Sequence, residues 1–180
     1  MVATQLLTAE DLLKMPDDGY RYELEWGVLR RMPQPNVRHG RIVLRVGRYL
    51  DEYADQHGGI VFTDSGVIVE RGPDVVRGPD IAFVAADRLP PDWDPSGYLP
   101  FGPDLVVEVA SPSDEKHEIE KRIAQLFAVG TRLIWYLDPE TRTITARRPD
   151  GSSRVYGEGE DLDGEDVLPD FRLAVAEIFR

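Results

Sequence analysis

Two acidic residues of this chain adjoin apolar segments, where a carboxylate could hold a metal ion. Asp80 directly precedes the apolar run 81–84, and Glu108 lies inside the apolar run 105–109. A buried carboxylate is costly unless it is paired or binds a metal. If the two runs are neighbouring strands, the carboxylates would repel each other, and a divalent cation is their natural partner. Such a cation could activate water and stabilise charge on a phosphate.

Both acids also have a purely structural interpretation. Asp80 follows Gly78-Pro79 and could cap a turn, and Glu108 could end a strand and pair with an arginine. Structural ion pairs often imitate functional sites, so the pattern alone leaves both interpretations open.

Length and composition indicate a single globular domain spanning residues 1–180. We expect an N-terminal helix and hairpin over 1–35, a core over 36–138, and C-terminal strands with a tail over 139–180. The chain has no cysteine, which excludes disulfides and thiolate zinc sites. It has no apolar run of membrane-spanning length and no signal-peptide pattern, so we expect a cytoplasmic protein without a membrane partner.

Charge is distributed unevenly along the chain. The net charge of −12 is awkward for a protein that binds nucleic acid, because phosphate contacts need cations. Residues 21–48, however, contain seven arginines and two acids, whereas residues 153–180 contain three arginines and eight acids. The sequence thus predicts a basic surface and an acidic tail.

Hydrophobic spacing predicts two long helices. Over 36–57 one face is apolar, and a separate stripe holds Arg38, Arg41, Arg45 and Arg48. This stripe is either a solvated face or a surface that contacts DNA phosphates. The second helix covers 114–129, capped by Ser113 or Asp114.

The remaining elements are mostly strands. A short helix over 8–14, capped by Thr8, precedes a hairpin over 21–32 that turns at Trp26-Gly27. We expect strands over 60–63, 66–69, 80–84, 104–109, 133–137, 143–147 and 154–156, a surface loop over 89–102 and a solvated loop over 157–166. This order predicts an α/β fold with a central mixed sheet flanked by two helices, an N-terminal hairpin and C-terminal antiparallel strands.

Several ordered motifs give the chain a family resemblance. They are Gly78-Pro79-Asp80, the segment from Glu108 to Ser113, the block from Gly130 through Trp135 to Asp138-Pro139, the Tyr22-Glu23-Leu24 hairpin and His39. In this order they resemble the Uma-like restriction endonucleases of the PD-(D/E)xK nuclease superfamily. The resemblance runs from about Leu7 to Phe179 and implies a restriction-endonuclease-like core.

The resemblance also implies an activity and roles for individual residues. It implies phosphodiester hydrolysis of DNA with Mg²⁺ or Mn²⁺, with Asp80 and Glu108 as metal ligands and the Val109 carbonyl completing the shell. Glu23 and His39 would support the site. Because cutting both strands needs two sites, a homodimer is a further expectation.

The chain departs from the superfamily pattern beside the metal pair. Ala110 stands where the superfamily has a lysine, and Leu126 stands where a tyrosine is expected. The resemblance implies that a lysine on the following helix takes over, and that position here is Arg122, with Lys121 beside it. Helical geometry places Arg122 beside the buried face and Lys121 nearly opposite. Arginine can stabilise a charged phosphate but cannot act as a base.

Two functions therefore follow from the sequence. The first is a metal-dependent DNA endonuclease that uses metal-activated water. The alternative is a catalytically weakened or inactive nuclease-fold module that binds DNA or a protein partner. His39 also has an alternative, as a satisfied core histidine, and Trp93 and Tyr98 either stack on bases or anchor their loop.

Overall fold

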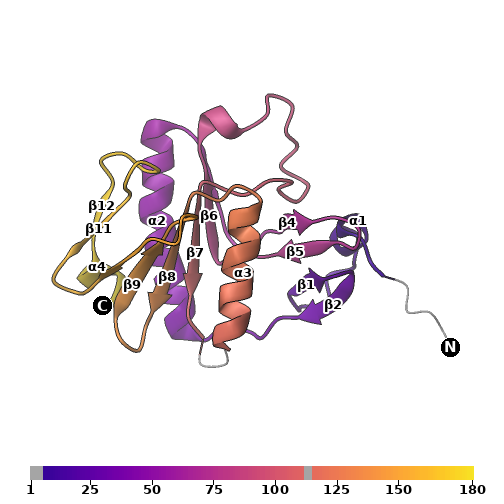
Figure 1. Cartoon of the computed structure of the whole chain (residues 1–180), viewed down its shortest axis with the longest axis horizontal. Coiled ribbons are helices and arrows are strands. Elements are labelled where there is room, and N and C mark those ends of the chain that lie inside the picture. Colours follow the sequence, from indigo (N-terminus) through magenta and orange to yellow (C-terminus); the bar gives the residue numbers. More distant parts are fainter. Residues whose placement is uncertain (1–5, 112–114) are drawn as a thin grey trace.

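A six-stranded mixed sheet forms the centre of the protein (Figure 1). The computed structural model describes residues 6–111 and 115–180. In spatial order the strands are β10 (Ser153–Tyr156), β9 (Thr143–Arg147), β8 (Leu133–Asp138), β7 (Leu105–Val109), β6 (Ile81–Val84) and β3 (Ile60–Phe62). Strands β7 and β8 are parallel, and the other neighbours are antiparallel. The apolar β7 and β8 lie in the middle because both of their faces are covered.

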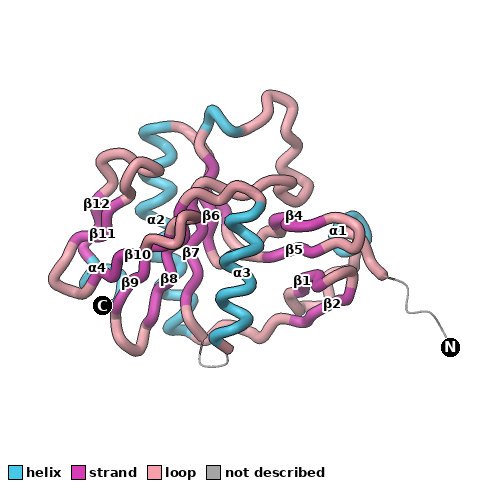
Figure 2. Tube along the Cα trace, viewed as in Figure 1, coloured by secondary structure: helices cyan, strands magenta, loops and turns pink. Residues whose placement is uncertain are grey.

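Two long helices cover the two faces of this sheet (Figure 2). Helix α2 (Val37–His57) begins at Asn36, whose side chain accepts from the His39 amide, and ends at Gly58 with a φ of 82°. Its buried stripe packs on one face of the sheet, and α3 (Lys116–Ala128) packs on the other through Ile123 and Leu126. Helix α2 matches the predicted range, whereas the predicted caps of α3, Ser113 and Asp114, lie outside the described residues.

A second, four-stranded sheet carries the N-terminal hairpin. Its order is β2 (Val28–Arg31), β1 (Tyr22–Glu25), β5 (Val75–Arg77) and β4 (Val67–Glu70). Trp26 and Gly27 have φ values of 55° and 75°, which suits the predicted two-residue turn. Helix α1 (Ala9–Leu13) packs against this sheet, and Thr8 with Asp11 forms the predicted cap.

The C-terminal segment closes one side of the main core. A two-stranded sheet of β11 (Asp161–Asp163) and β12 (Arg172–Ala174) precedes α4 (Val175–Phe179), and a short 3-10 helix, η1, covers Ala86–Arg88. The prediction of a solvated loop over 157–166 was wrong for β11, because Leu162 is fully buried in the core. A three-residue strand between acidic residues is too short to show alternation.

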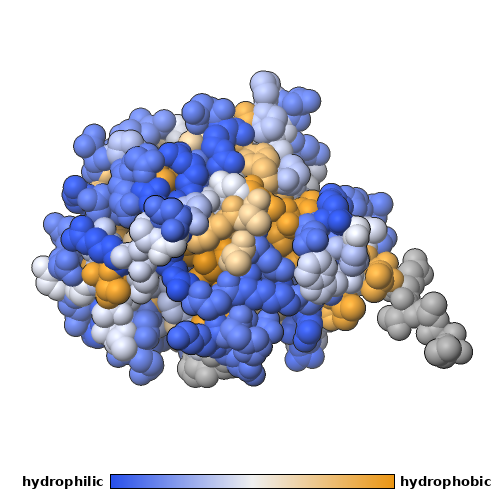
Figure 3. All heavy atoms as spheres, in the orientation of Figure 1, coloured by the Kyte–Doolittle hydropathy of each residue, from blue (hydrophilic) through white to orange (hydrophobic). Residues whose placement is uncertain are grey.

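The predicted α/β fold with a central mixed sheet is confirmed. Trp135 is fully buried and packs beside Phe171, as expected of a core residue. On the face in Figure 3, hydrophilic residues cover most of the surface, and apolar residues gather around the C-terminal end of α3. No helix in the described part of the chain is both long and apolar enough to cross a membrane.

Candidate functional site

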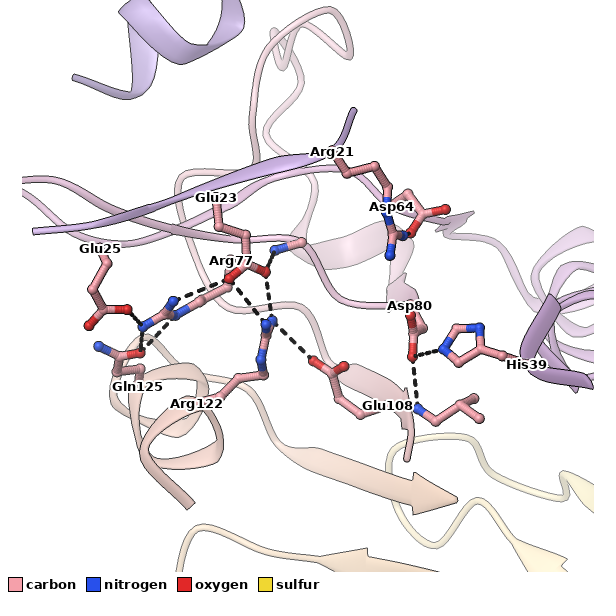
Figure 4. A network of polar contacts seen from close by, with 12 residues as sticks. Arg21, Glu23, Glu25, His39, Asp64, Arg77, Asp80, Glu108, Arg122 and Gln125 are labelled. Carbon is pink, nitrogen blue, oxygen red and sulfur yellow. Dashed lines mark hydrogen bonds and ion pairs between the residues drawn. The ribbon is translucent and has the colours of Figure 1, made fainter. Parts of the chain in front are cut away.

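Asp80 and Glu108 lie side by side at one end of the central sheet (Figure 4). Strands β6 and β7 are antiparallel neighbours with Ile81 opposite Val107, so the next pair outward is Asp80 and Glu108. The Val109 amide donates a hydrogen bond of 2.8 Å to Oδ2 of Asp80. Strands β6 and β7 are therefore neighbours, as the metal-site hypothesis requires.

His39 reaches Asp80 from the first turns of α2. Its Nε2 lies 3.1 Å from Oδ2 of Asp80, and its side chain is 14% exposed. A carboxylate only accepts hydrogen bonds, so Nε2 carries the proton in this contact. The contact places His39 beside the acidic pair rather than in an apolar core.

Arg122 is the cation that α3 directs toward the acidic pair. Its Nη1 donates to Glu23 at 2.8 Å and lies 3.6 Å from Oε1 of Glu108. Lys121 instead pairs with Glu25, away from Glu108. Of the two cations expected on this helix, Arg122 is the one next to Glu108.

Glu23 connects the hairpin to both Arg122 and the Asp80 strand. Its carboxylate accepts two hydrogen bonds from Arg122, one from Arg77 at 3.2 Å and one from the Gly78 amide at 2.8 Å. A buried charge needs such a complete set of partners. Because Gly78 lies two residues before Asp80, Glu23 fixes the backbone that leads into β6.

The sequence did not predict the contacts that Arg77 makes in this network. Arg77 also pairs with Glu25 and donates to Gln125 of α3 at 2.9 Å. Arg77 is only 6% exposed and Glu25 8%, although both residue types usually lie on the surface. The buried pair ties β5 and β1 to α3 and sets the distance between the hairpin and the helix.

These side chains line a cavity of about 590 Å³. Its lining combines the acids Asp80, Glu108, Glu23 and Glu25 with His39 and the cations Arg77 and Arg122. It continues over the segment 30–36 and the start of α3. A cavity that brings carboxylates and guanidinium groups together can hold a phosphate group and a divalent cation at once.

The two carboxylates offer ligands of the kind that magnesium prefers. Both hydrogen bonds that Asp80 makes with described residues use Oδ2, which leaves Oδ1 for another partner. Magnesium is usually held by one or two carboxylates together with substrate phosphate and water. Within the residues that the structure describes, no group of three or more His, Cys, Asp or Glu is arranged to hold a metal. Two carboxylates with oxygen ligands from a phosphate and from water fit the magnesium pattern.

Arg122 remains protonated in this setting. Burial lowers the pKa of its guanidinium, but the charges of Glu108 and Glu23 outweigh burial and raise the pKa above its ordinary value. Arg122 can therefore donate hydrogen bonds and stabilise negative charge, but it cannot remove a proton.

The predicted arginine stripe of α2 divides into two kinds of side chain. Arg38 pairs with Glu140 and donates to the Pro139 carbonyl, and Arg45 donates to the carbonyls of Ile178 and Arg180. Arg41 and Arg48 are exposed, and Arg48 lies over the Tyr49 ring at 4.4 Å. That this stripe contacts phosphate stays a prediction. Arg41 and Arg48 are the members best placed for such a contact, because both are exposed.

The aromatic residues of the loop over 89–102 serve as anchors. Trp93 packs against the core cluster beneath α3, and Tyr98 packs against the cluster under the hairpin. The ring of Tyr98 leaves no room for a side chain at Gly66. Neither aromatic residue lines the cavity that holds Asp80 and Glu108.

Comparisons with known proteins agree with the motifs. The profile of the Uma2 family, described as "Putative restriction endonuclease", matches residues 9–176. A crystal structure described as a putative nuclease belonging to DUF820, from Anabaena variabilis, has a TM-score of 0.80 at 21% identity. The alignment covers 96% of this chain and 97% of that one. A search of curated proteins found no match. The chain belongs to the Uma2 family of putative restriction endonucleases.

Proposed function

We propose that this protein is a metal-dependent endonuclease that hydrolyses phosphodiester bonds in DNA. The observation that supports this most is the placement of Asp80 and Glu108 opposite each other on β6 and β7, inside a cavity that also contains Arg122. Asp80 and Glu108 would hold Mg²⁺ or Mn²⁺, and the Val109 carbonyl is a further ligand candidate. When bound, the metal would stabilise charge on the phosphate and lower the pKa of water.

The other residues of the site have supporting roles in this proposal. His39 and the Val109 amide orient Asp80 through Oδ2. Glu23 holds Arg122 in place, so that its guanidinium can donate to a phosphate oxygen as charge develops there. Lys121 would act only indirectly, through its ion pair with Glu25.

A plasmid cleavage assay tests this function. Supercoiled DNA should be nicked or cut with Mg²⁺ or Mn²⁺, and Asp80→Ala should abolish the cleavage. Asp51→Ala, which removes an exposed acid from α2, should leave cleavage unchanged. DNA that stays intact with both metals would contradict the proposal.

A second candidate is a nuclease-fold module that binds DNA or a protein partner without cleaving DNA. The ion pair between Arg122 and Glu108 favours it, because a guanidinium beside Glu108 competes with a metal for that carboxylate. Calorimetry with Mn²⁺ separates the two functions. Metal binding that requires Asp80 and Glu108 supports the endonuclease. No metal binding, or binding unchanged in both alanine variants, supports the module.

We also propose that the active form is a homodimer. A single site cuts one strand at a time, and two copies related by symmetry would place one site on each strand. Light scattering coupled to size-exclusion chromatography tests this assembly. A mass near 20.3 kDa at all concentrations would contradict it.

A further inference from the structure

The lining of the cavity differs in charge from one part to another. The segment 30–36, here called the arginine wall, contains Arg30, Arg31, Gln34 and Asn36 and no acidic residue. The start of α3 contributes Glu115 and Glu118 to the same lining. A polyanion is attracted to the first part and repelled by the second.

Arg30 projects from β2 on the side that faces the cavity. In the antiparallel hairpin it lies directly opposite Glu23, and residues paired in this way share one face of the sheet. Glu23 lines the cavity, as does Arg30, which is an exposed residue. Arg31, the next residue, lies opposite Tyr22; it also lines the cavity, but its guanidinium stacks 3.6 Å from the Tyr20 ring.

Arg30 and Arg31 also differ from the other arginines of the cavity in their partners. Arg21 pairs with Asp64, Arg77 with Glu23 and Glu25, and Arg122 with Glu23 and Glu108. Neither Arg30 nor Arg31 makes an ion pair within the described part of the chain, but the guanidinium of Arg31 is held against the Tyr20 ring. Binding a phosphate would therefore break no existing ion pair of Arg30, whereas the three paired arginines would have to share or exchange a carboxylate.

We propose that Arg30 contacts a backbone phosphate of DNA, and that the DNA strand follows the arginine wall away from Glu115 and Glu118. This inference rests on the proposed function, because it takes DNA as the substrate of the cavity. It assigns the first phosphate contact to the hairpin rather than to the stripe of α2. The neutral amides of Gln34 and Asn36 on the same wall are suited to neighbouring phosphate and sugar oxygens.

Binding of a fluorescein-labelled DNA duplex, followed by anisotropy in EDTA, tests this contact without cleavage. Arg30→Gln should weaken binding by about tenfold and make the dependence of log K on log salt shallower by about one. Arg154→Gln removes the same charge from an exposed position on β10, outside the cavity lining, and should have a clearly smaller effect. Glu118→Gln should leave binding equal or tighter, and Arg30→Lys should retain the salt dependence.

The results separate this inference from the proposed function. If the wild-type protein binds the duplex and the Arg30 and Arg154 variants lose affinity equally, or neither loses affinity, the role of Arg30 alone is overturned. Binding that depends on Arg30 in a protein that never cleaves would uphold the contact and refute the endonuclease. A wild-type protein that does not bind the duplex would refute both.

Discussion

Nη1 of Arg122 lies 3.6 Å from Oε1 of Glu108, across the gap between α3 and β7. This contact joins the proposed metal site to the buried network of the hairpin, since the same nitrogen donates to Glu23 at 2.8 Å. A cation is thus present next to the acidic pair even though Ala110 stands where the motif resemblance predicts a lysine. Because this cation is an arginine, it can stabilise negative charge but cannot remove a proton.

Replacing Arg122 should affect both stability and cleavage. Arg122→Gln removes one cation from the buried Glu23, which keeps Arg77, and from the part-buried Glu108, and should lower the free energy of unfolding by about 3 kcal/mol. Loss of a donor to the charged phosphate should also reduce the cleavage rate by about 100-fold. Urea unfolding and single-turnover cleavage measure the two effects.

Lys121→Gln is the matched control for Arg122. It removes the neighbouring positive charge, but Lys121 pairs with Glu25 and does not line the cavity. Its cleavage rate should stay within a few-fold of wild type. A larger loss for Lys121 than for Arg122 would reverse the assignment of the two cations.

His39 should control how firmly the site holds a metal. It orients Asp80 through a contact of 3.1 Å, and removing such a supporting group typically weakens metal binding by about tenfold or more. Calorimetry with Mn²⁺ should therefore show weaker binding for His39→Ala, while His39→Gln, which can still donate, should retain part of the affinity. His117→Ala removes an exposed histidine of α3 and serves as the control. Identical Mn²⁺ affinities for wild type and His39→Ala would exclude this role.

Much of the fold could be predicted from sequence because its main elements have local signals. The apolar stripe of α2, the run 133–137 and the Trp26-Gly27 turn each predict their element from neighbouring residues. Strand β5 was missed because Val75–Arg77 has only three residues, too few for a period of two. Asp80 and Glu108 were singled out because each acid adjoins an apolar run, and the two runs are neighbouring strands.

The rest of the site depends on contacts between distant residues. Arg77 and Glu23 are 54 residues apart, and Arg122 and Glu23 are 99 apart, so no local spacing reports their pairing. His39 and Asp80 are 41 residues apart, so the expectation that His39 supports the site came from the family resemblance rather than from local spacing. Arg38 and Arg45 have partners beyond position 138, and local spacing could not predict those contacts either.

Acid should destabilise the protein partly through Glu25. Burial raises the pKa of this carboxyl, but the hydrogen bonds from Lys121 and Arg77 outweigh burial and hold the pKa below its ordinary 4.5. Its stabilising contribution is therefore complete above about pH 4.5 and is lost as the pH falls through the lower pKa of the folded state. Glu25→Gln should be less stable at neutral pH, and its unfolding free energy should decline less than that of wild type in acid.

Urea unfolding from about pH 7 to about pH 3 measures this difference. Glu140→Gln, which removes an exposed carboxylate after β8, should give a curve parallel to that of wild type. Parallel curves for Glu25→Gln and wild type would show that Glu25 does not contribute to the acid sensitivity.

The central claim is that Asp80 and Glu108 together hold a divalent metal. A crystal soaked in Mn²⁺ tests it most directly, because anomalous scattering locates manganese independently of activity. We expect one anomalous peak within coordination distance of both carboxylates in the wild-type protein, and no peak there in Asp80→Ala. An ordered wild-type site without a peak between the two carboxylates, with Arg122 still paired to Glu108, would contradict the claim.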